Sequence, residues 1–429
     1  MKRVVMFVWN HFTNDARVLR EAKTLQRNNY NVKIVAIHNP KTPELPEKEL
    51  LGPNIHIERV RMYPVLWDIF KKNKKIVLVA GGLYVIVGAA ISLRRSVMSS
   101  IGYLLRMCAF VQLLRTRSVQ RNALKVVRSL RMMVAGFKHK PDIVHSHDLN
   151  TLTQGILVSR LFGRKPLIYD SHEVQTERTG YNEKVAQIWE GSHVPFADRV
   201  IVENKTRGAL FEWMYGVRPL PLYNYSKYVD VKKVPDINVH ERLGLDPDEK
   251  ILLYQGGLQA GRGLEQLIDA MQYIEKGTLV FVGDGKIRGE LEEKVHQLNL
   301  ATRVKFIGKV PLEELFSYTK EAYIGFQVLQ NVNMNHYTAS SNKLFEYMMM
   351  HVPVVGCDLP EIAQVIEKEE VGLSIDAESP LEIANAVGRL TNDKKLYDKC
   401  VMNCKRAKHF YNWSREEKKL LDLYKGLYE

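Results

Sequence analysis

Hydrophobic and polar positions alternate in blocks along most of this chain. A short apolar run is followed, again and again, by a longer segment with apolar residues at helical spacing. At the N-terminus the run 2–9 predicts a strand, segment 16–25 predicts an amphipathic helix, and 32–37 predicts a second strand. This order is typical of a βαβ unit, in which a helix connects two parallel strands.

The same alternation resumes after Pro141 and predicts the rest of a first doubly wound domain. Strands are expected over 142–147, 166–173 and 197–204, and helices over 149–162, 184–193 and 205–214. Pro219, Pro221 and the aromatic, polar run to Asp236 indicate an interdomain connection.

A second domain of the same kind is expected from about Arg242 to Phe410. Its predicted strands are 251–254, 279–282, 304–307, 322–326 and 353–357, and its helices begin near 264, 287 and 342. A polar loop over 330–341 precedes the last of these helices. The final segment, 412–429, predicts a capped amphipathic helix that packs back toward the first domain.

Glycine turns after two strands of the second domain suggest a phosphate site. Gly256 and Gly257 end one strand, and Arg262 follows in the same turn. Backbone N–H groups in such a turn approach a phosphate closely, and a helix N-terminus and an arginine add positive charge. Asp284 and Gly285 form the next turn. An ordinary strand-helix connection is an equally good interpretation of the glycines alone.

The helix expected from Asn342 offers a second anion site at its N-terminus. The preceding loop delivers Ser340 and Ser341, and Asn342 and Lys343 begin the helix. Glu346 lies one helical turn further on, where a carboxylate is able to accept hydrogen bonds from sugar hydroxyls. Its alternative role is that of a solvated or helix-stabilising residue.

Polar residues also follow the strands of the first domain, where α/β sheets place their ligands. Asn10, His11 and Asn14 are candidate substrate contacts, or they only cap and turn the chain. His147 and Asp148 follow one later strand, and His172 and Glu173 follow the next. His145 and His147 suggest a metal site, but no third ligand is evident, so no metal is expected.

Residues 63–138 interrupt the α/β rhythm. Ile76 to Leu93 contains no charged residue, and 97–114 contains only Arg106. Helices lying on a membrane surface, with a basic rim, are the favoured interpretation. A re-entrant or spanning hairpin and an ordinary buried helix pair are the alternatives. Arg106 would be costly at the centre of a bilayer.

Charge and cysteine content narrow the possible partners and compartment. The formal charge is +14, and residues 61–140 hold 16 Lys and Arg against one acid, Asp68. The remaining chain is close to neutral, and the long uncharged runs favour lipid over nucleic acid. The four cysteines and the absence of a leader sequence predict a reducing cytoplasm. Cys400 and Cys404 are expected as free thiols on a solvated helix face.

Taken together, these segments resemble the family 4 glycosyltransferases, retaining nucleotide-sugar enzymes of the GT-B fold. The resemblance covers nearly all of the chain except about 63–138. It rests on NDARVLREAKTL, DIVHSHDLNTL, LIYDSHE, ADRVIVEN, YQGGLQAGRGLEQLI, FVGDG, VKFIGKV, SSNKLFEYMMMHVPVV and YNWSREEKKLLDLY, in family order. It implies two Rossmann-like doubly wound domains facing across a cleft: an acceptor-side domain, 1–222, that contains the insertion, and a donor domain, 223–411, followed by the terminal helix.

The resemblance also implies roles for single residues. His172 matches the family histidine near the donor sugar and acceptor hydroxyl, Arg262 a diphosphate ligand, and Glu346 the glutamate that binds the ribose. Asp284 and Gly285 match the turn near the base. The chain departs from the pattern twice, because the first basic diphosphate ligand falls on Gly256 and the first glutamate of the motif on Thr338. Lys343 is a candidate replacement for the missing charge.

The resulting hypothesis is a metal-independent, retaining hexosyl- or N-acetylhexosaminyl-transferase without a cofactor. Its expected donor is a UDP- or GDP-sugar, and its expected acceptor is a lipid-linked or other glycan in cell-surface polysaccharide or glycolipid assembly. We expect it on the cytoplasmic face of the cell membrane as a peripheral, monotopic protein on anionic lipid. The alternatives are an epimerase or hydrolase of nucleotide-sugars and a non-catalytic protein that binds membranes or nucleic acid. The sequence leaves the base, sugar, linkage and oligomeric state open.

Overall fold

The structure is a computed structural model that describes residues 1–429 except 14, 39–41, 43, 64–73, 95, 162, 179 and 429. The side chains of 74–81, 109–111 and 113–115 also lie outside the described part. By its internal contacts the chain divides into two compact units, residues 1–170 with 195–198, and residues 171–194 with 199–429. The domain boundaries expected near 222 and 411 stay predictions.

The first sheet has eight strands in the order β3-β4-β2-β1-β5-β6-β7-β8. All the pairings recorded for it are parallel except that of β3 with β4. The strands are β1 (Lys2–Phe7), β2 (Tyr30–Ile37), β3 (Lys48–Leu50), β4 (Ile55–Val60), β5 (Ile143–His147), β6 (Leu167–Ser171), β7 (Arg199–Val202) and β8 (Leu220–Pro221). The predicted strands are confirmed, and β1 is central, paired with β2 and β5. Strands β3 and β4 were not expected, because Lys, Glu, His and Arg break their apolar pattern.

Helices connect these strands. They are α1 (Ala16–Arg27), α6 (Leu149–Arg160), α7 (Glu183–His193) and α8 (Lys205–Tyr215), with short 3-10 helices at Gln175–Glu177 and Val194–Phe196. Their N-termini are fixed locally: the side chain of Asp15 accepts a hydrogen bond from Val18 N, and that of Asn204 accepts one from Arg207 N. Such caps satisfy backbone donors that a helix leaves unpaired.

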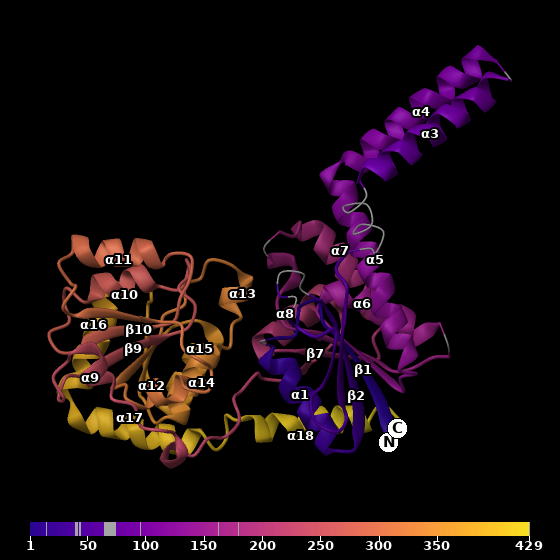
Figure 1. The fold of residues 1–429 in the computed structure, drawn as a ribbon. Helices are drawn as coiled ribbons and strands as arrows, with labels where there is room; N and C mark the ends of the chain where they lie inside the picture. The colour runs from indigo at the N-terminus through magenta and orange to yellow at the C-terminus, as the bar shows by residue number, and fades with distance from the viewer. Residues whose placement is uncertain are drawn as a thin grey trace. The chain divides into compact units, whose positions relative to one another are not determined.

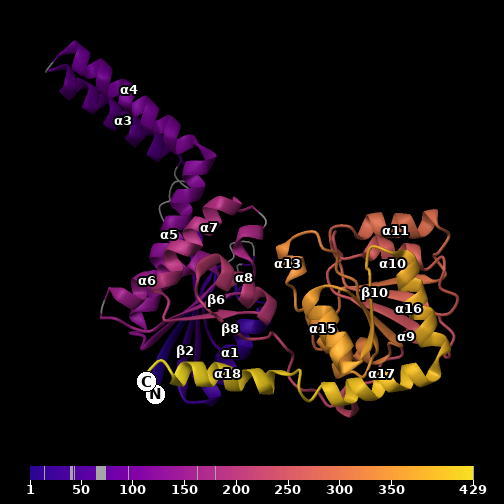
Figure 2. The ribbon, with the colours of Figure 1, turned by 180° about the vertical axis from the view of Figure 1, so that it is seen from behind.

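Three helices make up the insertion, and the first two match the predicted apolar runs: α3 (Lys74–Leu93), α4 (Val97–Arg115) and α5 (Arg117–Lys138). Helices α3 and α4 pack against each other as a hairpin, and α5 lies beside α6 in both ribbon views (Figures 1 and 2). Large apolar side chains of the hairpin are exposed, among them Leu83, Ile86 and Leu105. The alternative of an ordinary buried pair is therefore wrong for the described side chains. Within the described residues, none of the helices combines the length and the hydropathy that a membrane span requires.

The second sheet has six strands in the order β11-β10-β9-β12-β13-β14, and every recorded pairing is parallel. The strands are β9 (Ile251–Gln255), β10 (Thr278–Val282), β11 (Val304–Gly308), β12 (Ile324–Gln327), β13 (Val354–Cys357) and β14 (Gly372–Ile375). In Figure 1 the helices α10 (Leu264–Ala270) and α11 (Arg288–Gln297) lie above this sheet, and α12 (Leu315–Lys320) and α14 (Asn342–Met349) lie below it. The sheet is thus covered on both faces, and β9, β10 and β12 are buried throughout.

The remaining helices complete this unit. They are α9 (Val239–Leu243), α13 (Met334–Tyr337), α15 (Pro360–Glu369), α16 (Pro380–Asn392), α17 (Lys394–Ala407), α18 (Trp413–Lys425) and a 3-10 helix at Val231–Lys233. Helix α13 lies in the segment expected as a polar loop. Whether α18 packs toward the first domain stays a prediction.

The expectation of a solvated face for Cys400 and Cys404 is wrong. Both thiols are free, but they are 2% and 0% exposed, because α17 turns this side toward the core. The Sγ of Cys404 lies 3.5 Å from the carbonyl oxygen of Val352 and donates to it. Burial raises the pKa of Cys400 to about 11, and it also raises that of Cys404. The lysines of α17 lie on its exposed face. The spacing of the two cysteines alone did not reveal that they lie on the opposite, buried face.

Candidate functional site

Two glycine turns at the carboxyl ends of β9 and β10 pack backbone to backbone. Gly283 has a φ of 147°, and a Cβ there would lie 1.9 Å from the carbonyl oxygen of Gly256. The amide of Gly256 donates to the carbonyl of Val282 at 2.9 Å, and that of Leu258 donates to Asp284 at 3.0 Å. Only glycine allows this approach, so the two predicted turns form one glycine-lined edge of the sheet.

Lys343, at the start of α14, occupies the space beside Gly256. A Cβ at Gly256 would lie 3.1 Å from the Cε of Lys343 and 3.6 Å from its Nζ. The ammonium group lies 5.1 Å from the centre of the Tyr254 ring, within the range of a cation–π contact. Lys343 is 9% exposed, so its charge is directed into the turn. The structure therefore places this lysine where the sequence predicts a replacement charge.

A third basic side chain, His336 of α13, gathers at the same turn. Its Nδ1 lies 3.0 Å from the carbonyl oxygen of Gln330, and its Cε1 would lie 3.1 Å from a Cβ at Gly261. Burial lowers the pKa of His336, and the charges of Arg262 and Lys343 lower it further. The two predicted cations and this histidine thus act on one another electrostatically. Sequence reasoning missed His336 because the segment reads as a featureless polar loop.

Glu346 is held by a buried amide. The Nε2 of Gln255, the last residue of β9, donates to Glu346 Oε2 at 2.7 Å. The hydroxyl of Thr319 lies 2.7 Å from Gln255 Oε1, to which it donates. Gln255 is 1% exposed and Thr319 is fully buried, whereas Glu346 is half-buried. Gln255 and Thr319 together fix the direction of the Glu346 carboxylate. The apolar pattern of the strand gave no indication that Gln255 has this role.

The other expected donor residues lie along the same edge. The Ser341 hydroxyl donates to Gln327 Oε1 at 2.9 Å, at the end of β12, and Ser341 precedes α14 as its N-cap residue. Ser340 is buried and Asn342 exposed. Asp284 is also exposed, and its carboxylate accepts a hydrogen bond from Gly285 N at 2.8 Å. The carboxyl ends of β9, β10 and β12 and the start of α14 therefore carry the predicted donor-binding groups together.

Thr338, at the position of the motif's first glutamate, is 1% exposed. Its carbonyl accepts a hydrogen bond from Asn204 Nδ2 at 2.6 Å, and its hydroxyl lies 3.4 Å from Arg207 Nη2. Arg207 also donates from Nη1 to the carbonyl oxygen of His172 at 2.5 Å. This buried arginine connects His172 with Thr338 and was not expected from the sequence. Glu173 is exposed.

The acceptor-side loop after β1 is tied by its own side chains. Asn10 donates from Nδ2 to Asp15 at 2.7 Å and accepts from Phe12 N at 2.8 Å. The Nδ1 of His11 lies 2.9 Å from the carbonyl oxygen of Ile37. Both residues thus shape the turn, and a substrate contact stays a prediction for them. Asn14 lies outside the described residues.

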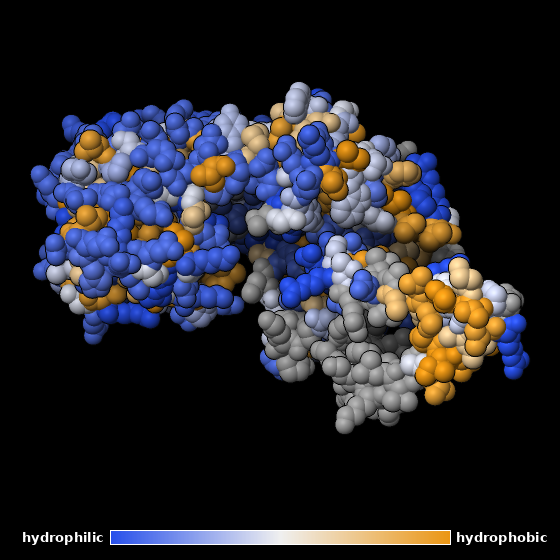
Figure 3. All heavy atoms as spheres, turned by 90° about the horizontal axis from the view of Figure 1, so that it is seen from above, coloured by the Kyte–Doolittle hydropathy of each residue, from blue (hydrophilic) through white to orange (hydrophobic). Residues whose placement is uncertain are grey.

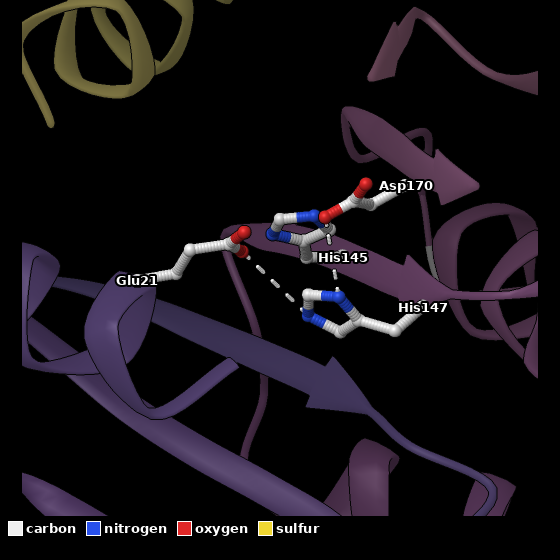
Figure 4. Close-up of side chains that lie close together, drawn as sticks. All are labelled: Glu21, His145, His147 and Asp170. Carbon is white, nitrogen blue, oxygen red and sulfur yellow. Dashed lines mark ion pairs between the residues drawn. The ribbon is translucent and has the colours of Figure 1, made fainter. Parts of the chain in front are cut away.

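His147 belongs to a buried cluster with Glu21, His145 and Asp170, whose side chains point toward one another (Figure 4). Candidate ligand atoms of the four residues lie within 4.8 Å of one another. The Nδ1 of His147 lies 3.5 Å from Asp170, and its Nε2 lies 4.0 Å from Glu21. Glu21 comes from α1 and Asp170 from β6. The possible ligands beyond the two histidines are therefore far from them in the sequence, which is why the sequence did not reveal them.

Two imidazoles and two carboxylates are a donor set that suits zinc or a related divalent cation. Arg17, however, already compensates the carboxylates. It donates from Nη2 and Nε to the two oxygens of Asp170 at 2.8 and 3.0 Å, and its Nε lies 3.2 Å from Glu21. The expectation of a metal-free protein stays a prediction. Asp148 follows with a φ of 63° at the start of α6.

Comparison with known proteins finds glycosyltransferases that are similar to this chain. Residues 249–393 match the model of the Glycosyl transferases group 1. This region contains the glycine edge, Arg262, Lys343 and Glu346. An uncharacterized glycosyltransferase of Methanocaldococcus jannaschii is 26% identical over 304 residues, which cover 67% of this chain and 75% of the relative.

Solved structures show the fold. Sucrose-phosphate synthase from Thermosynechococcus elongatus aligns with a TM-score of 0.70 at 18% identity, over 100% of this chain and 99% of that one. HepE from Anabaena, crystallised in complex with UDP, aligns with a TM-score of 0.68 at 15% identity, over 99% and 100%. The two-domain GT-B architecture is confirmed, and the findings support a glycosyltransferase of this fold. Membership of family 4 stays a prediction.

Proposed function

We propose that this protein is a retaining, metal-independent glycosyltransferase that moves a sugar from a nucleotide-sugar to a lipid-linked or other glycan acceptor. The observation that carries the proposal is the glycine-lined edge, where Arg262, Lys343 and His336 gather beside the carboxylate of Glu346. Crystal structures of HepE in complex with UDP and with UDP-glucose support a uridine nucleotide as the donor carrier. GDP-sugars remain the alternative donors.

Each group has a place in the reaction. Arg262 and Lys343 compensate the diphosphate, whose charge grows as the bond from the sugar C1 to its phosphate oxygen breaks. The acceptor oxygen forms the new bond to C1 on the same face, and its proton passes to the leaving diphosphate. Glu346 binds the ribose hydroxyls, and His172 positions the reacting groups. No residue needs to act as a covalent nucleophile.

The acceptor proposal rests on the insertion. Residues 61–140 carry the entire positive excess of the chain, next to long apolar runs. Such a surface suits an acceptor held in an anionic membrane, such as a polyprenyl-diphosphate oligosaccharide or a glycolipid. The protein would then act as a peripheral enzyme on the cytoplasmic face, in the assembly of cell-surface polysaccharide or glycolipid.

The test is transfer from radiolabelled UDP-, GDP- and ADP-sugars to the lipid extract of source cells, with EDTA present. We expect a labelled glycolipid whose anomeric configuration matches the donor, and its loss in Glu346→Ala but not in the surface control Glu293→Ala. Equal transfer to free sugars would refute the lipid acceptor. Nucleotide release or epimerised donor without any glycosylated product would refute the transferase.

A further inference from the structure

The hairpin of α3 and α4 exposes large apolar side chains on both of its helices. On α3, Tyr84, Ile86, Val87 and Ile91 are between 50% and 69% exposed and lie on one side of the helix, and the run from Ile76 to Leu93 carries no charge on any side. On α4 the outer apolar side chains are Val97, Met98, Ile101, Leu104 and Leu105. Figure 3 shows apolar residues gathered on the hairpin. A helix that is apolar all round is buried in a core or in lipid, rather than lying half-immersed at an interface.

In the part of the contact between the two helices that the structure describes, small residues meet hydroxyl groups. Tyr103 lies on Gly88, where an added Cβ would come within 2.2 Å of the tyrosine hydroxyl oxygen. The hydroxyl of Ser100 donates to the carbonyl oxygen of Ala89 at 3.0 Å. In water the apolar residues of a helix pair turn inward. Small residues and hydroxyls inside, with apolar side chains outside, are typical of helices that pack within hydrocarbon.

Charge around the hairpin complements anionic lipid. Between Lys74 and Lys138 the chain contains no Asp or Glu. Helix α5 exposes Arg117, Arg121 and Lys125, and it also exposes a stripe of Val126, Leu130 and Val134 at intervals of four residues. This helix, unlike the hairpin, is amphipathic and basic, which is the pattern of a helix lying at a membrane surface.

We propose that the α3–α4 hairpin inserts into the hydrocarbon of an anionic bilayer, while α5 lies along the headgroups. This refines the expected surface attachment, in which both apolar runs lie on the membrane. The uncharged run from Ile76 to Leu93 is about 27 Å long at 1.5 Å per residue, which is enough to reach deep into a hydrocarbon core about 30 Å thick. Arg94 and Arg106 are exposed, and in a bilayer their long aliphatic side chains would have to carry the guanidinium groups to a headgroup layer.

The inference deepens the proposed function, because it names the surface that holds the enzyme at a lipid acceptor. Cys108 on α4 provides a natural probe, since it is the exposed cysteine and Cys357, Cys400 and Cys404 are buried. The full-length protein is labelled there with an environment-sensitive fluorophore and mixed with vesicles of phosphatidylglycerol and phosphatidylcholine. We expect a blue shift, and quenching by a spin label on the acyl chain. A label at Glu293→Cys in the Cys108→Ser protein should not respond.

Two substitutions test the surface itself. Ile86→Asp with Leu105→Asp should reduce flotation with these vesicles at least tenfold, whereas Leu312→Asp, on an equally exposed leucine of the second unit, should not. A label that stays solvent-like on vesicles would overturn the proposal. So would a blue shift without vesicles that grows with protein concentration, because a second copy would then cover the hairpin. No donor or acceptor is used, and nucleotide binding by the Asp variant shows separately whether the transferase site is intact.

Discussion

The hydrogen bond from Gln255 to Glu346 gives the sharpest test of the proposed donor site. Gln255→Leu keeps a buried side chain of similar size but removes the amide that donates to Glu346 Oε2 at 2.7 Å. The Thr319 hydroxyl that donates to this amide retains a partner, the carbonyl oxygen of Leu315 at 2.9 Å. The fold should therefore persist, while the direction of the carboxylate is lost.

The expected loss of affinity follows from the negative charge of Glu346, which accepts this hydrogen bond. A hydrogen bond to a charged group contributes about 1.5–3 kcal/mol. Because Glu346 is half-buried and water replaces part of the loss, we expect the lower end of that range, which corresponds to roughly tenfold weaker binding. The assay is isothermal titration calorimetry with UDP, GDP and ADP, and the melting temperature serves as the control for folding.

A double-mutant cycle separates a positioning role from a general one. If Gln255 acts through Glu346, Gln255→Leu should cause almost no further loss of nucleotide affinity in the Glu346→Ala protein. An equal loss in both backgrounds would mean that Gln255 supports the site by another route. Unchanged affinity in the single variant would refute the idea that a fixed Glu346 carboxylate matters for the nucleotide.

Three further predictions concern charge. Lys343→Met should weaken UDP binding about 10–100-fold, because a charged hydrogen bond to the diphosphate is lost, and it should leave uridine binding nearly unchanged. Equal losses of affinity for UDP and uridine would place the lysine away from the diphosphate. Arg262 and Lys343 lower the pKa of His336, and a bound diphosphate should raise it, so UDP should bind more tightly as the pH falls from 8 to 5.5, less so in His336→Asn. Burial lowers the pKa of His351 to about 4, so as the pH falls the unfolded chain binds a proton at this histidine before the folded chain does. The free energy of unfolding should therefore decrease as the pH falls from about 6.5 to about 4. Calorimetry should show this decrease, and it should be smaller in His351→Asn.

Regular periodicity accounts for what the sequence predicts well. The strand 251–255 and the helix from Asn342 lie within one residue of their expected positions, because continuous apolar runs and 3.6-residue spacing are local signals. The two apolar helices of the insertion were predicted for the same reason. Strands β3 and β4 have no such signal, since half-exposed polar side chains interrupt them.

Long-range pairing accounts for what the sequence does not show. Glu21 of α1 joins His145, His147 and Asp170 only in the folded unit, and no spacing along the chain encodes this. The inner side of the hairpin also depends on pairing, because it is defined by the contacts of Tyr103 with Gly88 and of Ser100 with Ala89. Gln255 likewise acquires a role only once α14 is folded beside β9.

The most direct measurement of the central claim is saturation-transfer NMR on the purified protein with UDP-, GDP- and ADP-sugars, repeated with Glu346→Ala and Arg262→Ala. We expect one class of donor to give strong transfer to its ribose and base protons, and we expect both substitutions, but not Glu293→Ala, to weaken this transfer. Strong transfer that survives both substitutions would contradict the assignment of the glycine-lined edge as the donor site.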